Sequence, residues 1–118
     1  MYCTQREKPK TRRKIKKEIL YLNIKAKWFN RIWAGIKTRE YRDKTSYYDS
    51  RIGRKLHSIR YIWFMNGMNT NANQMLVEFN GLDDQDPYSN YQYVLKLGNI
   101  VSVDTHEIDR LITDKYVN

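Results

Sequence analysis

The chain has very few of the residues that cross-link small proteins or hold metals in them. It contains one cysteine, Cys3, which can form no internal disulfide and cannot support a cysteine zinc site. Its two histidines, His57 and His106, lie far apart and show no zinc-ligand spacing. We therefore expect no metal and no cofactor, and the scarcity of cysteine fits a reducing, cytoplasmic location.

Long apolar runs and the glycine patterns of nucleotide-dependent enzymes are also missing. No stretch approaches the about 18 consecutive apolar residues of a membrane helix, and no apolar run precedes Ile19, so we expect neither a membrane span nor a secretory signal. The G-x-S-x-G elbow of serine hydrolases, the P-loop and the dinucleotide fingerprint do not occur. These absences argue against a membrane protein and against acyl transfer by a Ser/His pair.

What the chain has in excess is positive charge. It carries 22 Lys or Arg against 13 Asp or Glu, a net charge of +9. The excess lies in residues 1–18 (eight bases, two acids) and 19–80 (eleven bases, four acids), whereas residues 81–118 (three bases, seven acids) are net acidic. Clustered positive charge is typical of proteins that bind polyanions, although charge that serves only solubility is the alternative.

The distribution of core residues divides the chain into a tail and one domain. Residues 1–18 are crowded with like charge and contain almost no core residues, so we expect a flexible basic tail. Such a tail is either an electrostatic arm for a phosphate backbone or merely solvated. Residues 19–118 are long enough for a single domain with one core.

The first half of the domain predicts a strand, a helix and a second strand. Residues 19–24 form an apolar run typical of a buried strand, and residues 26–34 change to a helical period that Gly35 ends in the left-handed conformation. Residues 37–43 alternate as a strand does.

Helix positions in this domain carry several large apolar side chains. On the first helix we expect Phe29, Ile32 and Trp33 in the core, and Trp28 either in the core or on the surface as a base-stacking ring. Two further helices are predicted at about residues 46–52, capped by Thr45 or Ser46 and ended by Gly53, and at about residues 104–113.

The second half of the domain predicts a hairpin, an acidic loop and a further strand. Residues 59–65 and 74–80 flank the turn Asn66-Gly67 and are expected to pair. Residues 91–97 predict the next strand, which Gly98-Asn99 separates from a short apolar run. The loop between the hairpin and this strand lacks the spacing of a calcium loop, so its three aspartates are expected to be solvated: Asp83, Asp84 and Asp86.

The segment Gly35-x-Lys37-x-x-Glu40-x-Arg42 contains two bases and an acid. They lie in the turn after the predicted helix and in the strand that follows it. Strand alternation would put Glu40 and Arg42 on one face, with Lys37 and Tyr41 on the other. The expected pair of Glu40 and Arg42 has two interpretations. In the first, it is a surface ion pair worth about 0–1 kcal/mol. In the second, Arg42 or Lys37 holds Glu40 in place so that Glu40 can orient a ligand or transfer a proton.

This segment resembles the G-x-K-x-x-E-x-R signature of ASCH domains, which belong to the PUA-like superfamily. Two later segments, residues 62–67 (IWFMNG) and 93–100 (YVLKLGNI), resemble a strand with its turn and a closing strand of that family. The resemblance covers roughly residues 19–103. It implies an α+β fold that is mainly β: a small PUA-like β-barrel of five to six strands with two or three flanking helices, and a basic cleft beside the motif.

Members of that family are generally thought to bind RNA or nucleotides. The resemblance therefore implies an RNA- or nucleotide-binding module, with DNA as an alternative ligand and a monomer as the expected state. The bases would contact phosphates, the aromatic rings would stack, and Glu40 would orient the motif lysine or read a base edge. The candidate binding residues are Lys25, Lys27, Trp28, Lys37, Glu40, Tyr41, Arg42, Arg51 and Arg54.

Two other classes of function stay open at this point. A small hydrolase, acting on a nucleoside amide or on RNA, would use Lys37 and Glu40 as catalytic residues, with Glu40 as general base for water. In the amidohydrolases of the family a hydroxyl residue stands where this chain has Glu40, which argues against that activity. The third class is a protein-interaction module or inhibitor that presents the same basic face to an acidic partner.

Overall fold

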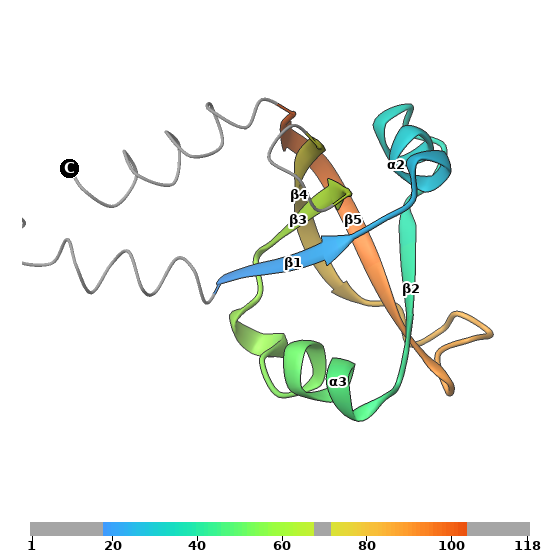
Figure 1. The fold of residues 1–118 in the computed structure, drawn as a ribbon. Helices are drawn as coiled ribbons and strands as arrows, with labels where there is room; N and C mark the ends of the chain where they lie inside the picture. Colours follow the sequence, from blue (N-terminus) through green and yellow to red (C-terminus); the bar gives the residue numbers. More distant parts are fainter. Residues whose placement is uncertain (1–17, 68–71, 104–118) are drawn as a thin grey trace, which may run out of the picture.

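The computed structural model describes residues 18–67 and 72–103, which form a mainly β fold with short helices (Figure 1). Its helices are α2 (Ala26–Trp33) and α3 (Ser46–Tyr48), which continues into a π-helical turn (Asp49–Gly53) and then a 3₁₀ turn (Leu56–Ser58). Its strands are β1 (Ile19–Asn23), β2 (Arg39–Asp43), β3 (Tyr61–Asn66), β4 (Asn73–Leu82) and β5 (Gln92–Ser102). The expected class, α+β and mainly β, is confirmed.

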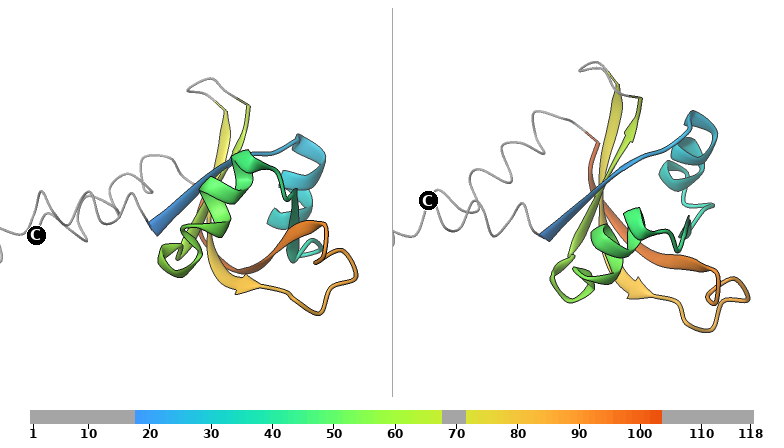
Figure 2. Two further views of the ribbon diagram at one scale, coloured as in Figure 1. Left: turned by 90° about the horizontal axis from the view of Figure 1, so that it is seen from below. Right: turned by 60° about the horizontal axis from the view of Figure 1, so that its bottom comes forward.

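The five strands form one mixed sheet in the order β1-β3-β4-β5-β2. β1 runs parallel to β3, and the other neighbouring pairs are antiparallel. The sheet curls into a half-barrel, with α3 and the turn after it on the concave side (Figure 2). β1 and β2 are therefore the two edges of the curled sheet, and the motif lies on one of them.

Alternation along the strands gives the sheet two apolar faces. The concave face and the helices share one buried cluster, which includes Leu20, Leu22, Phe29, Ile32, Ile52, Ile62, Phe64, Met75, Val77 and Leu95. The intervening residues Ile19, Trp63 and Leu76 form a smaller cluster on the opposite face. The predicted β3–β4 hairpin is confirmed, with Ile62 opposite Val77 and Phe64 opposite Met75.

Helix α2 buries a narrower face than its sequence predicts. Phe29 and Ile32 are buried as expected, but Trp33 is 54% exposed, so the expectation that it joins the core is wrong. At about 100° per residue, Trp28 and Trp33 each lie roughly 70° from the centre of the face that Phe29 and Ile32 define. Trp33 is also the last residue of the helix, where the chain turns toward β2.

Gly35 ends α2 in the conformation predicted for it. Its φ is +79°, its N–H donates to the carbonyl of Ile32, and the N–H of Ile36 donates to Arg31. This is the Schellman arrangement, which satisfies carbonyls left unpaired at the helix end.

Gly53 ends the helical segment as predicted, and it has a second role in packing. Its φ is not positive, since among the described glycines only Gly35, Gly67 and Gly81 have a positive φ. A Cβ at position 53 would lie 2.6 Å from the hydroxyl oxygen of Tyr93. That hydroxyl donates to Asp49. Close approach of β5 therefore requires glycine here.

Strand β5 is longer than the sequence predicts. It runs through Gly98-Asn99 without a break and ends at Ser102, and its pairing with β4 shifts register three times. Such irregularities increase the bend and twist of paired strands, which suits a curled sheet. β2 begins at Arg39, two residues later than predicted.

Two predicted segments lie outside the described residues: the basic tail at residues 1–18, of which only Glu18 is described, and the helix at about 104–113. In residues 18–67 and 72–103, no helix has the length and apolar character needed to cross a bilayer.

The close approach at Gly53 can be tested with Gly53→Ala. We expect the free energy of unfolding to fall by about 1–3 kcal/mol, because the methyl group overpacks against the Tyr93 hydroxyl. The loss should be smaller in a Tyr93→Phe background, where the clashing oxygen is gone. Urea unfolding of the four variants of this cycle measures the coupling, and an equal loss in both backgrounds would contradict the explanation.

Candidate functional site

The carboxylate of Glu40 is the centre of the motif. Glu40 is 6% exposed, although it lies on an edge strand. Its Oε1 is 3.2 Å from Nζ of Lys37, and its Oε2 accepts from Nε of Arg42 at 2.8 Å and lies 2.6 Å from Nη2. The predicted pair of Glu40 and Arg42 therefore exists, but it is buried and is shared with Lys37.

Besides Glu40, Arg42 contacts two other parts of the fold. Its Nη2 donates to the carbonyl oxygen of Asn23 at the end of β1, and its Nη1 donates to the hydroxyl of Tyr48 in α3, both at 2.8 Å. Burial alone would lower the pKa of Arg42, but the charge of Glu40 and the hydrogen bonds that Arg42 donates to Tyr48 and Glu40 outweigh it and raise the pKa. One guanidinium thus bridges the two edges of the half-barrel.

Lys37 reaches Glu40 because it precedes the strand. Its N–H donates to the carbonyl of Arg31 at 3.0 Å, so its backbone belongs to the end of α2. The predicted alternation, which put Lys37 and Glu40 on opposite faces, is wrong here because β2 begins only at Arg39. Its side chain is 15% exposed.

Trp28 is exposed and lies among cations. Trp28 is 37% exposed, so of the two predicted positions, core and surface, it occupies the surface. The ammonium of Lys27 lies 4.7 Å from the ring centroid, the guanidinium of Arg31 5.0 Å and the ammonium of Lys37 5.2 Å. Lys37 also lies 5.4 Å from the ring centroid of Tyr41.

The acidic loop is tied to β2, so the expectation that it is simply solvated is wrong for two of its aspartates. Asp83 accepts from Nε of Arg39 at 3.0 Å, and Asp86 accepts from the hydroxyl of Tyr41 at 2.8 Å. The hydrogen bond from Arg39 lowers the pKa of Asp83, and the bond to Asp86 raises the pKa of Tyr41. The ring of Tyr88 meets that of Tyr41 edge-on at 6.0 Å.

Other predicted residues lie on the helices around this network. Arg51 lies 4.3 Å from the ring centroid of Tyr47, which contacts Tyr48 and through it Arg42. Lys25 and Arg54 are exposed and form no ion pair within the described ranges.

The structure thus brings six of the nine predicted residues into one group that is linked by direct contacts: Lys27, Trp28, Lys37, Glu40, Tyr41 and Arg42. Sequence reasoning missed Arg31, which its i, i+3 spacing from Trp28 on the helix could have indicated. It also missed the carbonyl of Asn23 and the ring of Tyr88, for which no local signal exists. No group of three metal-ligating side chains occurs in the described part of the chain.

The buried carboxylate can be tested with Glu40→Gln. We expect the free energy of unfolding to fall by about 3–5 kcal/mol, because two largely buried cations lose their counter-charge. Urea unfolding followed by circular dichroism measures the loss. Asp84→Asn removes the same charge from an exposed position in the loop and should change stability by less than about 0.5 kcal/mol. Equal effects of the two substitutions would show that Glu40 forms only a surface ion pair.

The contact of the acidic loop with β2 predicts a pH dependence. Because the folded pKa of Asp83 is lowered, the contact is complete above the ordinary aspartate pKa and is lost as the pH falls through the lowered value. Carbon-detected NMR titration of the Asp83 carboxyl should show its midpoint rising in Arg39→Gln. Arg60→Gln, which removes the same charge from a residue paired with Glu18, should leave the midpoint unchanged. An unchanged midpoint in Arg39→Gln would contradict the contact.

Comparison of the chain with family models, with curated proteins and with solved structures finds no match.

Proposed function

We propose that this chain is an ASCH-like, PUA-like module that binds RNA or nucleotides on the basic face made by α2, the motif and α3. The charge balance of residues 25–55 carries the proposal. This stretch has ten Lys or Arg and three acids. Each acid already has a partner within the fold, because Glu40 pairs with Lys37 and Arg42, Asp43 accepts from Gln92, and Asp49 accepts from Tyr93. The remaining positive charge faces solvent and favours a polyanion.

The cations of this face differ in what they can offer a phosphate. Arg42 donates hydrogen bonds within the fold from all three of its nitrogens, so its role is to position the other cations of this face. Lys37 directs its ammonium to Glu40, and since an ammonium has three donors it keeps capacity for a ligand. The exposed bases supply the remaining contacts: Lys25, Lys27, Arg31, Arg51 and Arg54.

The ASCH resemblance supports the same proposal. Three charged residues of the signature, Lys37, Glu40 and Arg42, converge in one ion network on the edge of a curled, mainly β sheet. A sequence signature whose charged residues lie together in space supports a resemblance more strongly than one whose residues lie on separate surfaces.

Hydrolysis by Lys37 and Glu40 has less support than binding. A general base needs a lone pair that a water molecule can reach. Both oxygens of Glu40 already face cations, and its side chain is only 8% exposed. This geometry suits a residue that positions Lys37.

The proposal can be tested by fluorescence anisotropy of the full chain with labelled RNA over a salt series. Lys37→Ala should weaken binding and reduce the slope of log affinity against log salt by about one, as expected for one lost phosphate contact. Arg60→Gln is the control, since Arg60 is exposed, carries the same charge and pairs with Glu18. It should keep the slope of the unchanged protein.

A second full-length variant separates the basic face from the N-terminal bases. In it, Gln replaces Arg12, Arg13, Lys14, Lys16 and Lys17. If this variant loses all affinity while Lys37→Ala loses none, the N-terminal bases alone bind and the proposal is wrong. The absence of affinity for RNA, DNA and nucleotides at low salt would favour the protein-interaction class.

A further inference from the structure

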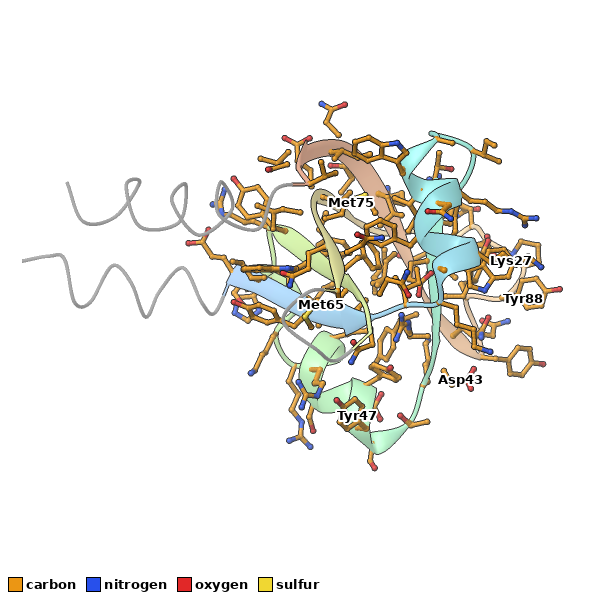
Figure 3. All side chains as sticks on the ribbon, turned by 45° about the horizontal axis from the view of Figure 1, so that its top comes forward. Lys27, Asp43, Tyr47, Met65, Met75 and Tyr88 are labelled. Carbon is orange, nitrogen blue, oxygen red and sulfur yellow. The ribbon has the colours of Figure 1, made fainter. Side chains whose placement is uncertain are left out.

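Three aromatic rings near the motif form a continuous row with cations between and around them. Lys37 lies 5.2 Å from the ring centroid of Trp28 and 5.4 Å from that of Tyr41, and Tyr41 meets Tyr88 at 6.0 Å. We call Trp28, Tyr41 and Tyr88 the aromatic row. Figure 3 shows Lys27, which lies next to Trp28, and Tyr88, at the other end of the row, on the same side of the molecule.

The two ends of the row are exposed and the middle is fixed. Trp28 is 37% exposed and Tyr88 is 59% exposed. Asp86 accepts from the hydroxyl of Tyr41 through Oδ2 and from the backbone N–H of Tyr88 through Oδ1 at 2.9 Å. One carboxylate therefore sets the position of Tyr88 relative to β2.

We propose that the ligand of this face is a single-stranded nucleic acid, with unpaired bases stacked on Trp28 and Tyr88 and phosphates on Lys27, Arg31 and Lys37. The inference rests on the proposed function and narrows it to a ligand class. Exposed rings interleaved with cations fit a strand whose bases are free to stack. In a duplex the base faces are already stacked on one another, so such rings would have nothing to bind.

The cations around Trp28 do not prevent a base from stacking there. Lys27 and Arg31 are exposed and have no carboxylate partner within residues 18–67 and 72–103. Each can leave the ring for a phosphate at little cost, since a cation–π contact at an exposed site contributes less than the stacking of a base on an aromatic ring.

Trp33 provides a matched comparison on the same helix. It is more exposed than Trp28, at 54%. No cation lies over its ring among the described residues, whereas three surround Trp28. Exposure alone therefore does not distinguish the two tryptophans, but their electrostatic surroundings do.

The test measures binding of the full chain to three labelled ligands of the same length, about eight nucleotides. They are a single strand, its duplex, and an abasic strand that keeps the phosphates and lacks the bases. The unchanged protein should prefer the single strand to both others. Trp28→Leu should weaken binding to the single strand by roughly tenfold or more and remove its preference over the abasic strand. Trp33→Leu should change neither.

Tyr88→Leu is a second variant, in a loop, and should weaken binding to the single strand without weakening binding to the abasic strand. If the unchanged protein binds all three ligands equally, the single-strand proposal is wrong while the proposed binding of RNA or nucleotides stands. If Trp28→Leu loses equal affinity for the single strand and the abasic strand, stacking is likewise excluded. If the protein binds none of them nor a free nucleotide, both proposals fail.

Discussion

The guanidinium of Arg42 spans the gap between the two edges of the half-barrel, and the rest of the site depends on it. A curled sheet that does not close leaves backbone groups of its edge strands without strand partners. Arg42 donates to one of them, the carbonyl of Asn23, and also holds Tyr48. A largely buried charge needs a counter-charge, and Glu40 provides it. Local alternation suggests a surface ion pair of Glu40 and Arg42, but this pair links the two edges of the half-barrel.

Lys37 connects this closure to the outer surface. It is held by the same carboxylate as Arg42, yet its ammonium also lies near the rings of Trp28 and Tyr41. A ligand that binds this ammonium would disturb the ion network of Glu40 and Arg42 between the two edge strands. A change in that network would in turn move the ammonium. Binding and local stability are thus expected to be linked at this residue.

Sequence patterns predicted the features that depend on neighbours along the chain. The strands, Gly35 as the end of α2, and the Thr45 cap, which accepts from the N–H of Tyr48, follow from alternation and helix-end chemistry. The predictions that were wrong or incomplete concern residues whose partners are distant in the sequence. Gly53 is required by a ring of β5, and the aspartates at 83 and 86 are held by side chains of β2. No local pattern contains those partners. The exposure of Trp33 depends on how wide a helix face the sheet can cover, which a helical period alone does not give.

The pairing of β2 with β5 has a consequence for the order in which the molecule folds. The β3–β4 hairpin joins residues close in sequence, whereas Arg39 pairs with Lys96 and Ile19 with Tyr61. Closing such long loops costs chain entropy before any contact repays it, so low-separation contacts are favoured first. The motif strand therefore gains its neighbour late. During synthesis the aromatic row cannot be complete until Tyr88 has left the ribosome, and β2 has no strand partner until β5 has left it. A nascent chain would therefore carry its positive charge before it carries a binding site.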